Sequence, residues 1–104
     1  VQTCALPIFY SLDEITNIVK PIAKKYGVDA VFLFGSYAKG TATDESDIDF
    51  IVFGGKDFKL ALVYAMGEEL REAFQKEIDI FEIHEVNEES DFYHNVMRER
   101  TRVA

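Results

Sequence analysis

Two short apolar runs constrain the fold of this chain more than any other feature. Ala30–Phe34 and Phe50–Phe53 contain no polar side chain, so each predicts a strand that is covered on both faces. The segment between them, Gly35–Asp49, holds a Gly-Ser pair, a short helix or turn, and an Asp-x-Asp pair. This pattern favours a small sheet flanked by helices, with the polar segment near one edge of the sheet.

Helical patterns precede and follow these strands. Ser11 and Glu14 form a capping box, an apolar helical period follows them, and Gly27 ends this first helix. Pro21 removes one helix hydrogen bond and is expected to kink the helix. A second long helix is expected after Asp57, which we predict as its N-cap. The apolar stripe of this second helix comprises Phe58, Leu62, Ala65, Met66, Leu70, Ala73 and Phe74.

A third strand and a last helix complete the expected elements. The third strand is predicted over residues 77–83, where Asp79 lies on the same face as Phe81. That face should be buried, so the carboxylate of Asp79 has to be paired or bound to a metal ion, unless the end of the strand is solvated. Ser90 or Asp91 is expected to cap the last helix.

The polar segment carries groups that suit a metal ion and a phosphate. Asp47 and Asp49 are two residues apart on a strand, so their carboxylates share one face and repel unless a cation lies between them. Ligand sets made only of oxygen favour magnesium or manganese, which also bind substrate phosphates. Gly35 lets the backbone turn close to a ligand. Ser36 can cap a helix start and offer its hydroxyl and backbone N–H to a phosphate.

The spacing of these groups resembles the signature of a known family. Gly35-Ser36, then ten residues, then Asp47-x-Asp49 is similar to the motif of the DNA polymerase beta-like nucleotidyltransferase superfamily. The small size of the chain and the residues of the motif resemble the minimal nucleotidyltransferase (MNT) branch. Many members of that branch are antitoxins paired with HEPN-domain toxins. The resemblance runs from Ser11 to the end of the chain.

The resemblance implies which carboxylates perform the chemistry. Asp47, Asp49 and Asp79 take the positions of the catalytic and metal-binding acids, which hold two magnesium ions, or manganese, in the family. The third of these acids maps onto Asp79, and Glu77 and Glu82 are its competitors. Glu77 shares the face of Asp79 but lies further out, whereas Glu82 lies on the other face.

The resemblance also implies a substrate and a partner. Gly35, Ser36 and Lys39 take the nucleotide-binding positions, with ATP as the substrate. Lys39 stands where arginine is common in the family, so the positive charge is kept but a bidentate grip on phosphate is lost. The implied reaction is adenylylation (AMPylation): AMP is transferred to a hydroxyl, that of a tyrosine, on a HEPN-type toxin. The chain would then act as the antitoxin in a hetero-oligomer with that toxin.

The same site fixes the expected sheet topology. Gly35-Ser36 follows the end of the first strand and Asp47-x-Asp49 opens the second, and both must reach one nucleotide, so these strands should be antiparallel. The second and third strands are joined by a long helix, which is the connection that a parallel pair needs. We therefore expect an α/β (α+β) fold with a mixed three-stranded sheet flanked by helices, in the order α-β-α-β-α-β-α. The family fold has this form.

The length of the chain indicates the number of domains, and its cysteine content bears on the redox setting. A chain of 104 residues is one domain, which we place at residues 9–104. Residues 1–8 read like a translated sequencing adapter and are interpreted as a non-native leader; a genuine disordered lead-in is the alternative. No apolar run approaches the length of a membrane-spanning helix. The single cysteine, Cys4, fits a reducing, cytoplasmic setting.

Charge bears on the partner. The net charge of −8 disfavours direct binding of nucleic acid and favours a basic protein partner, although acidity can also serve solubility alone. His84 and His94 lack the spacing of metal ligands and are expected to be plain surface residues.

Two other functions stay open: a non-catalytic module that masks a basic toxin, and a small-molecule nucleotidyltransferase with a helper subunit. Three converging carboxylates favour the enzyme, because a purely binding module has no evident use for them.

Overall fold

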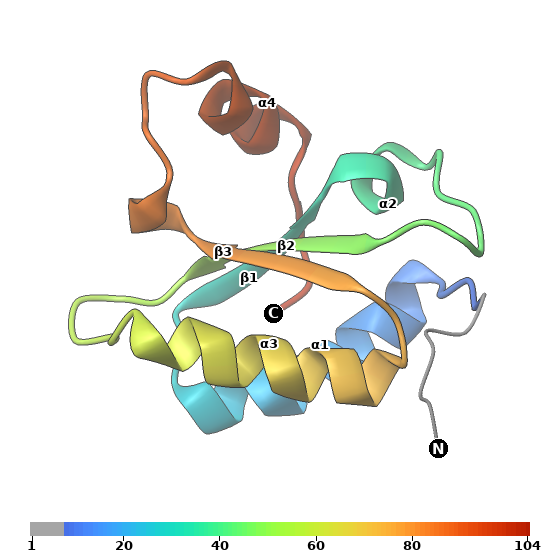
Figure 1. Ribbon diagram of the computed structural model, residues 1–104, viewed down its shortest axis with the longest axis horizontal. Coiled ribbons are helices and arrows are strands. Elements are labelled where there is room, and N and C mark those ends of the chain that lie inside the picture. Colours follow the sequence, from blue (N-terminus) through green and yellow to red (C-terminus); the bar gives the residue numbers. More distant parts are fainter. Residues whose placement is uncertain (1–7) are drawn as a thin grey trace.

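A computed structural model describes residues 8–104, and the interpretation of residues 1–8 as a leader therefore lies, apart from Ile8, outside the described residues. The chain folds into a four-stranded sheet, in the order β3-β2-β1-β4, with helices on both faces (Figure 1). The elements in chain order are α1 (Leu12–Tyr26), β1 (Ala30–Phe34), α2 (Gly35–Lys39), β2 (Ile48–Phe53), α3 (Ala61–Phe74), β3 (Ile78–Glu82), the 3-10 helix η1 (Ile83–Glu85), α4 (Asp91–Glu99) and β4 (Thr101–Arg102).

The expected mixed sheet and the order of its main elements are confirmed, with one correction. The sheet has four strands instead of three, because β4 (Thr101–Arg102) pairs antiparallel with β1 after α4 ends. A strand of two residues is too short to leave an alternating pattern in the sequence. Its position at the outer side of β1 depends on contacts between distant parts of the chain.

Strand pairing brings three parts of the polar signature to one edge of the sheet. β1 and β2 are antiparallel, with Phe34 opposite Asp49, and β2 and β3 are parallel, with Asp49 opposite Asp79. Both strand directions are as expected. Because Gly35 directly follows Phe34, the turn into α2 and the two carboxylates lie beside one another.

The two faces of the sheet are covered unequally. Helices α1 and α3 pack side by side on one face, where they bury most of the apolar core (Figure 1). On the other face α4 covers a smaller group built around Phe34, Ile51 and Val96. The residues of the larger core include Ile15, Val19, Leu33, Phe50, Met66, Leu70 and Phe74.

Helix α1 forms as its sequence predicts. Ser11 and Glu14 exchange the two hydrogen bonds of a capping box, and Gly27 ends the helix in the left-handed conformation with φ of +68°. The helix continues through Pro21.

The start of α3 differs from expectation. The helix begins at Ala61 with Leu60 as its N-cap, so Asp57 does not cap it. Its buried face contains Val63 and Gly67, whereas Leu62 is 37% exposed. Phe58 lies in the segment before the helix, against Gly54, and Ala65 and Ala73 of the predicted stripe are exposed together with Leu62. Gly67 allows α3 to approach the sheet closely, since a Cβ there would lie 3.0 Å from Cγ2 of Ile80.

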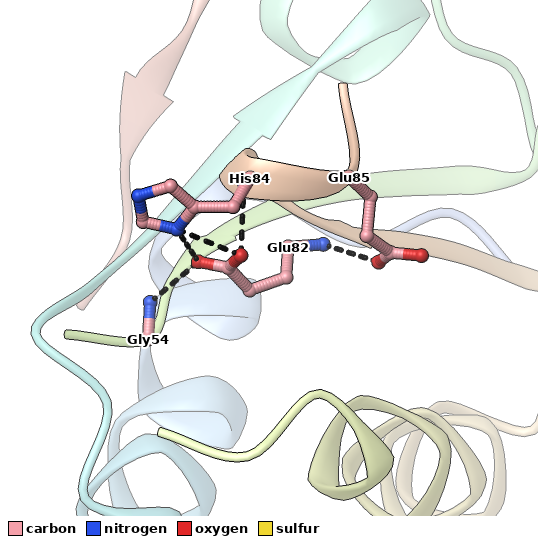
Figure 2. Close-up of polar contacts among 4 residues, drawn as sticks. All are labelled: Gly54, Glu82, His84 and Glu85. Atoms are coloured by element: carbon pink, nitrogen blue, oxygen red, sulfur yellow. Dashed lines mark hydrogen bonds and ion pairs between the residues drawn. The ribbon is translucent and has the colours of Figure 1, made fainter. Parts of the chain in front are cut away.

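A buried carboxylate joins the far ends of β2 and β3. Glu82 is only 4% exposed, and its carboxylate accepts hydrogen bonds from the backbone N–H groups of Gly54 (3.2 Å) and His84 (2.8 Å). Nδ1 of His84 lies 3.0 Å from the same carboxylate, and Glu85 accepts from the N–H of Glu82 (Figure 2). Glu82 lies at the opposite end of β3 from Asp79, so it does not compete for the position beside Asp49.

We expect Glu82→Ala to lower the free energy of unfolding by about 1–3 kcal/mol, because the buried N–H of Gly54 would lose its acceptor. Urea denaturation followed by circular dichroism measures the change. Glu88→Ala is the matched control, since Glu88 is exposed and should leave the midpoint within experimental error. Equal midpoints for the two variants would contradict the structural role of Glu82.

Candidate active site

Asp49 and Asp79 are the two carboxylates that the fold places together. Asp49 lies in β2, half-buried, and faces Asp79 in β3 through the parallel register. Asp47 comes one residue before β2 and is exposed. Asp79 is also exposed, which corrects the expectation that its face is buried. β3 is the outer strand of the sheet, and Phe81 on the same face is only half-buried, so solvent reaches Asp79.

The surroundings of Asp49 raise the pKa of its carboxyl from its ordinary value to about 7. Burial contributes most, followed by the charge of Asp79, a hydrogen bond with Asp79, and the charge of Asp47. Each of these disfavours the ionised form. Near neutral pH, the carboxyl of Asp49 is therefore only partly ionised unless a cation offsets the effect of its surroundings.

Gly35 forms the wall of the site next to Asp49. Its φ of +69° lies in the left-handed region, and a Cβ built at Gly35 would overlap Oδ2 of Asp49. Two features therefore favour glycine at this position: the backbone conformation and the close contact with the carboxylate. Ser36 follows it in the first turn of α2 and is half-buried. The predicted Gly-Ser turn and the Asp-x-Asp pair are thus neighbours.

The chemistry of this donor set fits a hard divalent cation. All of its groups are carboxylate oxygens, and a cation bound between Asp49 and Asp79 would offset both the burial and the repulsion that raise the pKa of Asp49. Within residues 8–104, no group of three His, Cys, Asp or Glu side chains is arranged to hold one ion. Asp47 acts on Asp49 through its charge, and the convergence of all three acids on ions stays a prediction.

Lys39, His84 and His94 each contact another side chain. The ammonium of Lys39 lies 3.4 Å from a carboxylate oxygen of Glu99, which links α2 to α4. His84 is exposed and contacts the carboxylate of Glu82, while His94 is exposed with its ring edge-on to Tyr93. The histidines are surface residues as expected, although His84 also contributes to the polar network of Glu82.

Sequence reasoning missed a residue that anchors the loop before Asp47. Lys76 is only 6% exposed, and its ammonium donates a hydrogen bond of 2.8 Å to the carbonyl of Asp44. The contact joins the segment after α3 to the loop that carries the Asp-x-Asp pair. No local pattern could have indicated it, because the two residues are 32 positions apart.

Comparison with known proteins identifies the family. The polymerase beta nucleotidyltransferase model matches residues 17–104. A Methanocaldococcus jannaschii relative named "Putative protein adenylyltransferase" is 36% identical over 70 residues, 67% of this chain and 75% of the relative. The protein adenylyltransferase MntA of Thermococcus cleftensis is 37% identical over 46 residues, 40% of this chain and 46% of MntA. A crystal structure of a toxin–antitoxin with AMP-PNP has a similar fold, with a TM-score of 0.73 at 19% identity, covering 86% of this chain and 72% of that one.

These findings define the class of protein. The fold is similar to that of solved nucleotidyltransferases, and the chain belongs to the polymerase beta nucleotidyltransferase family. The match covers 75% of the length of the M. jannaschii relative but only 46% of the length of the T. cleftensis relative. No helix in the described part of the chain is long and apolar enough to cross a membrane.

We expect Gly35→Ala to destabilise the protein more than Gly40→Ala does. Both glycines have positive φ, so each substitution costs about 1–2 kcal/mol of backbone strain. A Cβ at Gly40 meets nothing within 4 Å, whereas one at Gly35 displaces the carboxylate of Asp49. Urea denaturation of the two variants isolates that contact, and an equal loss of stability in both would show that Gly35 does not confine Asp49.

The pKa of Asp49 predicts how stability depends on pH without metal. Native Asp49 keeps its proton up to about pH 7, whereas the unfolded chain releases it near pH 3.8. Between these values the native state binds more protons, so the free energy of unfolding falls as pH rises. In EDTA, the wild type should therefore lose more stability between pH 5 and pH 8 than Asp49→Asn does. Thermal melts across this range provide the test, and parallel curves would refute the raised pKa.

Proposed function

We propose that this chain is a magnesium-dependent protein adenylyltransferase that transfers AMP from ATP to a tyrosine hydroxyl of a HEPN-type toxin and thereby acts as its antitoxin. The observation that carries the proposal is the in-register pair Asp49 and Asp79 beside the Gly35 turn. The names of the relatives, and the toxin–antitoxin structure with AMP-PNP, support the same reaction and a toxin as the partner.

Each site residue has a role in this reaction. Gly35 and Ser36 would receive the phosphates of ATP in the first turn of α2, with Lys39 as a nearby positive charge. Asp47 and Asp49 would hold one magnesium ion, and Asp49 with Asp79 the second. Bound there, the two ions, or manganese in their place, would supply charge stabilisation for the attacking and leaving oxygens.

The proposed transfer moves one proton and exchanges one bond at phosphorus. Asp79 orients the tyrosine hydroxyl and accepts its proton as the O–H bond breaks. The tyrosine oxygen forms a bond to the α-phosphorus of ATP, and the bond from that phosphorus to the oxygen bridging to the β-phosphate breaks. The electron pair of the broken bond leaves with pyrophosphate, and AMP stays on the tyrosine.

The charge of the chain supports a basic protein partner. The net charge of −8 repels nucleic acid and attracts a positively charged surface. The proposal therefore includes a cytoplasmic hetero-oligomer of this chain with the toxin. Masking of the toxin without chemistry, and modification of a small molecule with a helper subunit, are the outcomes that the following experiment separates from it.

We expect Asp79→Asn to abolish AMP transfer while retaining most of the binding of Mg-ATP, because Asp79 acts on the acceptor and Asp47 and Asp49 still hold the triphosphate ion. Transfer is measured as an AMP mass increment on a HEPN-type toxin incubated with ATP. Binding is measured as the rise in melting temperature that Mg-ATP causes.

Two variants control this experiment. Glu77→Gln removes an exposed charge just before the same strand and should transfer AMP at the wild-type rate. The double variant Asp47→Asn, Asp49→Asn should lose the Mg-ATP shift while staying folded. If wild type and Asp79→Asn neutralise the toxin equally and no increment appears, the chain is a binding module and not an enzyme.

A further inference from the structure

Three aromatic rings form a cluster on the same face of the sheet as the paired acids. Phe34 is opposite Asp49 in the antiparallel register, and Phe81 is two residues beyond Asp79, so all four side chains project from one face. Phe92 of α4 completes the cluster. Its ring centroid lies 5.5 Å from that of Phe34 and 5.5 Å from that of Phe81, with interplanar angles of 84° and 69°.

Phe92 is the open member of this cluster. Phe34 is 8% exposed, whereas Phe92 is 40% exposed although it contacts two other rings. Phe81 is half-buried. The edge-to-face geometry therefore leaves part of the ring of Phe92 available to a further aromatic group, on the face where Asp79 is reached by solvent.

Phe81 places one side of the cluster on the strand that carries Asp79, whereas Phe34 places the other side next to the Gly35 turn. The Gly35 turn, which would receive the phosphates, lies at the end of β1, whereas Phe81 and Asp79 lie on β3, on the other side of β2. Two residues along a strand span about 6.6 Å. A tyrosine can touch an aromatic ring at Phe81 and still present its hydroxyl near Asp79, whereas the hydroxymethyl group of serine is too short to do both.

We propose that Phe92, together with Phe81, binds the aromatic ring of the acceptor tyrosine and directs its hydroxyl toward Asp79. This inference rests on the proposed function and adds to it a residue that determines specificity for tyrosine over serine or threonine. A partly exposed aromatic surface next to the acids favours a flat aromatic side chain, because edge-to-face and offset contacts add to the burial of apolar area.

The ring contact can be measured without any transfer. The wild-type protein is saturated with magnesium and AMP-PNP and titrated with N-acetyl-tyrosinamide, and NMR records nuclear Overhauser effects between the tyrosine ring and the ring of Phe92. N-acetyl-serinamide is the control ligand and should bind at least about tenfold more weakly. Absence of contacts between the tyrosine ring and Phe92, or contacts of Phe92 with the adenine of AMP-PNP instead, would overturn the inference.

Three variants test the same point with a folded protein. Phe92→Leu keeps apolar volume but removes the ring, and should weaken binding of N-acetyl-tyrosinamide about tenfold and raise KM for the toxin by a similar factor. Phe92→Tyr keeps the ring and should behave like the wild type. Leu62→Ala removes an apolar side chain that is 37% exposed on α3, over the opposite face, and should change neither quantity.

Failure of this inference can be told apart from failure of the proposed function. If the toxin gains no AMP but the tyrosine ring contacts Phe92, the ring site stands and the transfer reaction fails. If the toxin gains AMP and Phe92→Leu matches the wild type in KM and in ligand binding, the reaction stands and the ring site is refuted.

Discussion

The closeness of Asp49 and Asp79 is the constraint on which the rest of the site depends. Two carboxylates side by side on neighbouring strands repel each other, and partial burial adds to the cost of charging Asp49. Such a pair gives the fold no stability of its own. It is held in place by the ladder between β2 and β3 and by the apolar core that α1 and α3 form beneath the sheet. The stable part of the molecule thus holds an unfavourable pair in the arrangement that a cation would relieve.

Local signals in the sequence account for the parts of the fold that could be predicted. Ala30–Phe34 forms a strand, and Phe50–Phe53 forms most of another, because apolar residues fill both faces of these runs. Helix α1 is bounded by a capping box and a left-handed glycine. The direction of each strand pair follows from the connection between its members and from the need for Gly35 and Asp49 to meet. These features depend on short stretches of chain, and a single sequence contains them.

The features that could not be predicted depend on which distant element covers which face. Asp79 and Glu82 are charged residues on opposite faces of β3, and the sequence alone does not say which face is covered. Helix α3 packs close to Ile80 through Gly67, and on this face Ile78 and Glu82 are buried and Ile80 is half-buried. The carboxylate of Glu82 accepts its hydrogen bonds there. The face of Asp79 is covered only in part and stays exposed. The two-residue strand β4 and the contact of Lys76 with Asp44 are missed for the same reason.

In the proposed reaction, the unequal cover of the two faces would let one sheet edge bind both the nucleotide and the acceptor. Asp49 lies in an inner strand, half-buried and next to the backbone of Gly35, where the charge of a bound cation would be less screened by water than at the exposed Asp79. Asp79 lies one strand further out, where a second molecule can reach it. If α4 covered this face as fully as α1 and α3 cover the other, the acids would still be paired but no acceptor could approach them. The partial cover that leaves Phe92 exposed is therefore the same feature that keeps Asp79 accessible.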